Sequence, residues 1–329
     1  MKKCAWVLFV SLVGIIPVYG VELKDAGYSL QSYAQYASPT SSGQMTMDDA
    51  GNLYVAHYDD GKIMKIDSSG QSAAFASGLG NLNDITWGGG TAYGNYLYAS
   101  SRSPDFTNDK ILRIDLTGNA TAFASMTIPA HAVTFVGIDR TGNYGGSMFS
   151  SGSAQDRLYS ISLSGNVTLY ADWPGYVNGG GPYGIAFDTN GKYNNKMYLT
   201  TIFLEPQNAN VSGLFMMNPN GTVSRFAADL VAAGTVDFDP AGTYFDNDMF
   251  VTGRTNVNDP LSLWRVFADG SCEEFMTGVS AFTFGDDGAM YVSQYNWGTS
   301  VVTISRVIPE PATLLLLAAG GLVLRKRKA

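Results

Sequence analysis

The stretch KIMKIDSSGQSAAFA, residues 62–76, decides the fold because four later stretches repeat its layout. Each copy has a strand-like run, a tight turn that ends in Gly, and an aromatic residue five positions after that Gly. The Gly and aromatic pairs are Gly70 and Phe75, Gly118 and Phe123, Gly165 and Tyr170, Gly221 and Phe226, and Gly270 and Phe275. Successive glycines lie 48, 47, 56 and 49 residues apart. This period in a β-rich chain predicts the blades of a β-propeller.

A second hairpin precedes each copy. It is short around Gly51 and Gly288, and it is longer in four central copies, over 93–98, 142–149, 191–198 and 242–250. Runs rich in Val, Ile, Phe and Tyr between Gly turns are typical of β-hairpins. Each unit is therefore expected to hold four antiparallel strands, A to D.

A sixth unit reaches its strand C at Thr303 to Val307 and then stops. Its missing strand D is expected at Ser29 to Ala34, which ends in Tyr33-Ala34 as the other D strands end in an aromatic residue and Ala or Met. Pairing of these two segments would cover two open sheet edges. The prediction is an all-β, six-bladed propeller over residues 21–307 with its N-terminal strand closing the last blade; an open two-sheet sandwich is the alternative.

Composition sets limits on function. The 329 residues are 45% hydrophobic and 15% charged, with 38 Gly, which argues against disorder and against a helical bundle. Residues 21–308 hold 14 basic and 27 acidic side chains, a net charge of −13. A chain so acidic repels phosphate backbones, so no nucleic-acid partner is expected.

The N-terminus has the pattern of a secretory signal. Lys2 and Lys3 precede an apolar run from Ala5 to Val18, and Gly20 follows shortly after. Residues 1–20 are therefore predicted to be a signal peptide removed by signal peptidase, with an uncleaved anchor as the alternative. Cleavage would leave Cys272 as the one cysteine of the exported chain.

The C-terminus has three parts. Pro309, Glu310 and Pro311 come first, an apolar segment follows from Ala312 to Leu324, and a basic cluster closes the chain: Arg325, Lys326, Arg327 and Lys328. The apolar segment is the expected membrane helix, and the basic cluster is its stop on the cytoplasmic side. A plain tail anchor is the alternative interpretation.

Residues 308–329 resemble the PEP-CTERM sorting signal of exosortase substrates in Gram-negative bacteria. The resemblance implies export to the cell envelope, tethering through the C-terminal helix, and processing by an exosortase-type membrane protease. It also implies an association with exopolysaccharide.

Two strings, PYGIAFD at 182–188 and DDAGNLYV at 48–55, are similar to the repeats of NHL and gluconolactonase-like propellers. Gluconolactonase-like enzymes hold a divalent ion in the channel through a Glu, an Asn and an Asp. The matching Glu is absent near Gln44. Asp84, placed just before one strand A, and Asp237, within another, are the candidate ligands for Ca²⁺. A purely structural role for both is the alternative.

Function is expected on the longer B to C and D to A connections, because variable loops on a rigid scaffold usually carry it. These loops hold Tyr58 and Phe106 and the candidate ligand face of Trp173, Tyr176, Phe203, Tyr295 and Trp297. Flat aromatic rings beside polar groups stack on sugar rings, so a glycan is the expected ligand. Packing between blades is the alternative role for each ring.

The usual hydrolase and nucleotide motifs are missing: no HExxH, no G-x-S-x-G and no P-loop. A ligand- or partner-binding module at the cell envelope is therefore the first functional prediction. A metal-dependent gluconolactonase-like hydrolase is the second, and a passive surface component the third.

Overall fold

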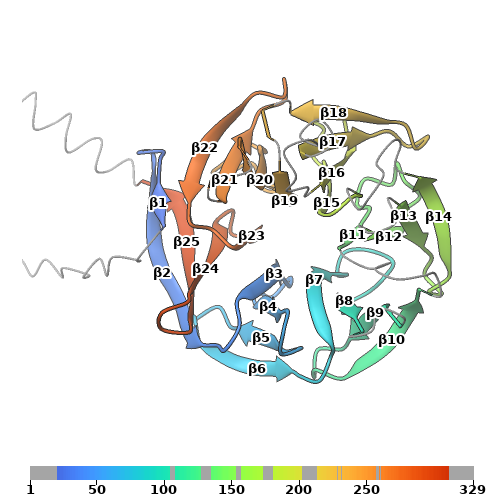
Figure 1. Cartoon of the computed structure of the whole chain (residues 1–329), viewed down its shortest axis with the longest axis horizontal. Helices are drawn as coiled ribbons and strands as arrows, with labels where there is room; N and C mark the ends of the chain where they lie inside the picture. The colour runs from blue at the N-terminus through green and yellow to red at the C-terminus, as the bar shows by residue number, and fades with distance from the viewer. Residues whose placement is uncertain are drawn as a thin grey trace, which may run out of the picture.

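The computed structural model describes residues 21–103, 108–126, 135–152, 157–172, 181–201, 213–227, 229–230, 232–256, 259 and 261–310. These residues form six antiparallel sheets arranged as a ring around a central channel, as Figure 1 shows. The six-bladed propeller is confirmed, and the open sandwich is wrong. Among the described residues no helix is long and apolar enough to cross a membrane. The predicted signal helix and C-terminal helix lie outside them.

Each blade runs from an inner strand A to an outer strand D. Blades I to III are β3 (Ser42–Met47), β4 (Leu53–His57), β5 (Ile63–Ile66) and β6 (Ser72–Ala76); β7 (Asn81–Trp87), β8 (Leu97–Arg102), β9 (Lys110–Ile114) and β10 (Ala120–Ser125); and β11 (Val136–Ile138), β12 (Met148–Gly152), β13 (Arg157–Ile161) and β14 (Val167–Asp172).

Blades IV to VI complete the ring. Their strands are β15 (Ile185–Phe187), β16 (Met197–Thr201), β17 (Gly213–Met217) and β18 (Val223–Ala227); β19 (Ala232–Phe238), β20 (Met249–Arg254), β21 (Ser262–Val266), β22 (Cys272–Thr277) and the added β1 (Glu22–Leu23); and β23 (Ala281–Phe284), β24 (Met290–Asn296), β25 (Val301–Pro309) and β2 (Tyr28–Ala37).

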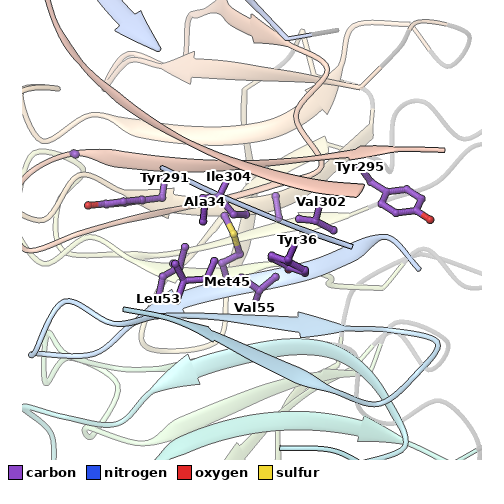
Figure 2. Packing of buried hydrophobic residues seen from close by; sticks show 12 residues of the cluster. Ala34, Tyr36, Met45, Leu53, Val55, Tyr291, Tyr295, Val302 and Ile304 are labelled. Carbon is purple, nitrogen blue, oxygen red and sulfur yellow. The ribbon is translucent and has the colours of Figure 1, made fainter. Parts of the chain in front are cut away.

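The two ends of the chain close blade VI. Strand β2 pairs with β25 over its whole length, from Tyr28 opposite Pro309 to Ala37 opposite Val301. Buried side chains from β2, β24 and β25 pack there against β3 and β4 of blade I, as Figure 2 shows for Ala34, Met45 and Ile304. The predicted closure is confirmed, and the strand is longer than the expected Ser29 to Ala34.

The constant offset between Gly and aromatic residue has a structural cause. In every blade the aromatic residue of strand D is the extra residue of a β-bulge, as Phe75 is between Ala74 and Ala76. The carbonyl oxygen of Phe75 meets Gly118 of the next blade so closely that a Cβ at Gly118 would overlap it. The same contact joins Gly70 to Tyr33, Gly165 to Phe123 and Gly270 to Phe226. The spacing therefore encodes how one blade docks on the next.

The longer A to B hairpins of blades II to IV make a second contact between blades. Each carries a Tyr whose hydroxyl donates to the last carbonyl of a strand C in the following blade: Tyr93 to Ile161, Tyr144 to Met217 and Tyr193 to Val266, all at 2.5 Å. In blades III to V, main-chain N–H groups surround a buried carboxylate of this hairpin, Asp139, Asp188 or Asp239, and Asp139 accepts four of them, from residues 141, 142, 144 and 146. These carboxylates organise turns, which satisfies their acceptors without a cation.

Candidate functional site at the central channel

The inner strands of all six blades line the channel. In blades II to V a hydroxyl on strand B accepts the N–H of a residue in or just before strand A: Ser100 from Asp84, Ser151 from Phe135, Thr200 from Gly184 and Thr252 from Thr235. This repeated bond places equivalent residues at one level of the channel. This bond was not predicted, although a Ser or Thr recurs two residues after the aromatic residue of strand B and could have indicated it.

The channel has two ends. The A to B and C to D hairpins surround one, here called the hairpin end; the B to C and D to A connections surround the other, the loop end. A cavity of about 320 Å³ reaches the hairpin end and is lined by Asp84, Asp237, Arg140, Trp87 and Asp286, among others. The hairpin end therefore holds a cavity lined by charged and aromatic side chains, whereas function was expected at the loop end.

Asp84 and Asp237 come from opposite blades, II and V, at different levels. Asp84 lies within β7, not before it as predicted, and its two carboxylate oxygens accept the N–H groups of Ile85 and Val136, both at 2.8 Å. Asp237 accepts the N–H of Phe238 at 2.9 Å. Burial raises the pKa of each carboxyl to about 7, against the opposing effect of these donors. Both groups can therefore exchange a proton near neutral pH.

The described residues of the channel offer few of the oxygen ligands that Ca²⁺ needs. Ca²⁺ takes six to eight oxygen ligands, whereas the described residues contain no group of three or more His, Cys, Asp or Glu placed to hold a metal. Both oxygens of Asp84 are already occupied by main-chain donors. The role of Asp84 and Asp237 as Ca²⁺ ligands stays a prediction.

A second cavity, of about 310 Å³, lies at the loop end. Its lining includes Asn83, Arg102 and three aromatic side chains, Tyr58, Phe135 and Tyr183. The rings of Phe135 and Tyr183 lie 4.3 Å apart between centroids and are tilted by 48°. The side-chain nitrogen of Asn83 is buried and has no hydrogen-bond partner. A hydrogen bond from Thr235 to Gln44, 2.7 Å long, spans non-neighbouring blades at this level.

The predicted ligand face divides into three cases. Trp173, Tyr176 and Phe203, like Phe106, lie outside the described residues. Tyr295 is buried, and its hydroxyl donates to the carbonyl of Ser38 at 3.3 Å, so its ring fills the seam between blades. Trp297 is 79% exposed and packs edge-on against Tyr295. Tyr58, in contrast, lines the loop-end cavity.

The sorting motif begins inside the propeller. Pro309 is the last residue of β25 and lies opposite Tyr28, and the N–H of Glu310 donates to the carbonyl of Gly27 at 2.8 Å. Pro311 and the basic cluster Arg325 to Lys328 lie outside the described residues. The propeller and the motif therefore share residues, with no spacer between them.

Comparison with known proteins supports these two parts separately. Residues 307–328 match the model of the PEP-CTERM protein-sorting motif. A search of curated proteins finds none that matches the chain.

Solved structures share the propeller at low identity. A gluconolactonase from Xanthomonas campestris has a TM-score of 0.62 at 12% identity, covering 88% of this chain and 95% of its own. A virginiamycin B lyase from Staphylococcus aureus has a TM-score of 0.56 at 13% identity, covering 86% and 100%. A PQQ-bound aldose sugar dehydrogenase from Streptomyces coelicolor has a TM-score of 0.57 at 13% identity, covering 87% and 99%. At such identities the likeness shows the fold alone. The chain carries a PEP-CTERM sorting motif on a six-bladed propeller that resembles gluconolactonases.

Proposed function

We propose that the chain is an exported, membrane-tethered binding module that takes a sugar-type ligand in the loop-end cavity of its channel. The observation that carries the proposal is that Asn83, whose side-chain nitrogen is buried and unpartnered, lines a cavity together with Tyr58, Phe135 and Tyr183. A buried donor without an acceptor is costly unless a ligand or water supplies one. A sugar offers hydroxyl acceptors for such an amide and a flat face for the rings.

The experiment is glycan-array screening of the purified full chain, followed by calorimetry on each hit with the Asn83→Leu variant. Leu replaces the amide by an apolar group of similar size, so the variant should melt as the native protein does while its affinity falls at least about tenfold. Leu169→Ala, a change on the outer strand of blade III where Leu169 is half exposed, is the matched control and should bind normally. An array without hits, or unchanged affinity in Asn83→Leu, contradicts the proposal.

A second candidate is hydrolysis in the hairpin-end cavity, which the raised pKa of Asp84 and Asp237 favours. Near pH 7 one carboxylate can take a proton from water as the water oxygen adds to a lactone carbonyl. The other, protonated, carboxyl can give its proton to the ring oxygen as the ring C–O bond breaks, leaving a hydroxy acid. A lactone screen with Ca²⁺ and with chelator tests it. Turnover that is lost in both Asp84→Asn and Asp237→Asn supports hydrolysis, and no turnover under either condition counts against it.

A further inference from the structure

The chain leaves the propeller at the hairpin end. In blades I to V a turn joins strand C to strand D at this end, whereas in blade VI the two strands are the two ends of the chain, β25 and β2. The bond between Glu310 and Gly27 stands where that turn would be. The tail thus starts from the same ring of tips as the five C to D turns.

The distance from this ring to the apolar segment is short. Pro311 alone separates Glu310 from Ala312, where the apolar run of the sorting signal begins. One extended residue spans about 3.5 Å. An apolar segment inserted in a membrane therefore holds the hairpin end close to the membrane surface.

Two of these tips carry exposed leucines. Leu116 and Leu163 are 50% and 57% exposed and hold the same position in the C to D turns of the neighbouring blades II and III. The corresponding residues of blades I, IV and V are Ser68, Pro219 and Ala268. The Leu116 turn is held by Asp115, whose carboxylate accepts the N–H groups of Thr117 and Asn119, both at 2.9 Å. A fixed turn presents its apolar side chain outward on the face from which the tail leaves.

We infer that the hairpin end of the propeller lies against the lipid bilayer when the tail is inserted, with Leu116 and Leu163 in the membrane interface. The tail makes this contact intramolecular, so that a small apolar contact suffices. Exposed carboxylates at the same end, Asp49, Asp269 and Asp286, oppose anionic lipid. The surface therefore fits a zwitterionic bilayer, and the loop-end cavity faces away from it.

The test places an environment-sensitive fluorophore at single cysteines of the full chain in a Cys4→Ser, Cys272→Ser background. Labelled Leu116→Cys, Leu163→Cys and, as the loop-end control, Trp297→Cys are reconstituted into phosphatidylcholine vesicles that contain a lipid-borne quencher. Labels at 116 and 163 should be quenched at least about twofold more than the label at 297. Equal quenching at the three sites, or stronger quenching at 297, overturns the inference.

A second measurement keeps both leucines in place by moving the label to another turn. The label is placed at Ser68→Cys, the same turn position in blade I, with Leu116 and Leu163 intact or both changed to Asp. Quenching at 68 should fall to the level at 297 in the double Asp variant, and it should weaken when phosphatidylglycerol is added at low salt. Quenching at 68 that is unchanged in the double Asp variant overturns the role of the leucines.

Discussion

Tyr33 donates its hydroxyl hydrogen to the carbonyl of Asp67 at 2.8 Å and so joins the strand that closes the ring to the C to D turn of blade I. Its ring also packs edge-on against Tyr291, with centroids 4.9 Å apart. Blade VI and blade I thus meet through one side chain of the N-terminal strand. The bulge at Tyr33 brings its carbonyl onto Gly70, as Phe75 does for Gly118 one blade later.

Truncation of this side chain should weaken the closure. Tyr33→Phe removes the bond to Asp67 and should lower the free energy of unfolding by about 1 kcal/mol. Tyr33→Ala also removes the ring and should cost about 2 to 3 kcal/mol, since the ring is only half buried. Urea unfolding of both variants checks the order. Equal stability of all three proteins would show that the closing strand contributes little through this residue.

Two glycines with similar backbone angles should differ in their tolerance of Ala. Gly118 has φ +89° and Gly142 has φ +76°, but a Cβ at Gly142 meets nothing within 4 Å while one at Gly118 overlaps the carbonyl of Phe75. Gly142→Ala should cost about 1 kcal/mol for the left-handed backbone alone. Gly118→Ala should cost at least about 2 kcal/mol, because blades I and II must separate. Thermal melting compares the pair, and equal losses would contradict the role assigned to the contact.

The channel carboxyls should make the protein less stable as pH rises through neutrality. The pKa of Asp84 and Asp237 is about 7 in the fold and near 3.8 ordinarily, so between these values the folded state binds more protons than the unfolded state. Their contribution is fully present below about pH 4 and is lost as pH rises through about 7. Asp84→Asn or Asp237→Asn should flatten that decline in melting temperature. A decline that persists in the double variant would place its cause elsewhere.

His57 should make the protein less stable as pH falls, which is opposite to the effect of Asp84 and Asp237. Its Nε2 and Nδ1 atoms lie 3.0 Å from the hydroxyls of Tyr36 and Ser38, and the Ser38 hydroxyl donates to Thr40. The neutral ring therefore donates from Nδ1 and accepts at Nε2, and burial lowers the pKa of His57 below its usual 6.5.

A lowered histidine pKa means that the unfolded state binds the proton more readily. The stabilising contribution of His57 is present above about pH 6.5 and is lost as pH falls through its folded pKa. In an Asp84→Asn, Asp237→Asn background, melting temperature should fall with acidification below about 6.5, and His57→Gln should remove that fall. A fall of the same size in His57→Gln would contradict this assignment.

Local repetition made the ring predictable. The offset between Gly70 and Phe75 recurs because it reflects a bulge and a contact between blades, which every blade needs. Strand β1 was missed because Glu22 and Leu23 have no repeat partner and pair only with the outer strand of blade V. The channel was harder to predict, since Asn83, Tyr58 and Tyr183 come from different blades and only their juxtaposition makes a cavity. The burial of Tyr295 was hard to predict for the same reason, because its partner Ser38 is 257 residues distant in sequence.

The last strand of the ring, β25, is also the last part of the propeller to be synthesised. Until Val301 to Pro309 emerges, β2 and β24 both lack the neighbour that separates them. A nascent or prematurely terminated polypeptide that stops before Val301 therefore exposes two unpaired strand edges, each a template for aggregation. Because the sorting tail is translated after β25, a chain that carries the tail already contains the strand that covers these two edges.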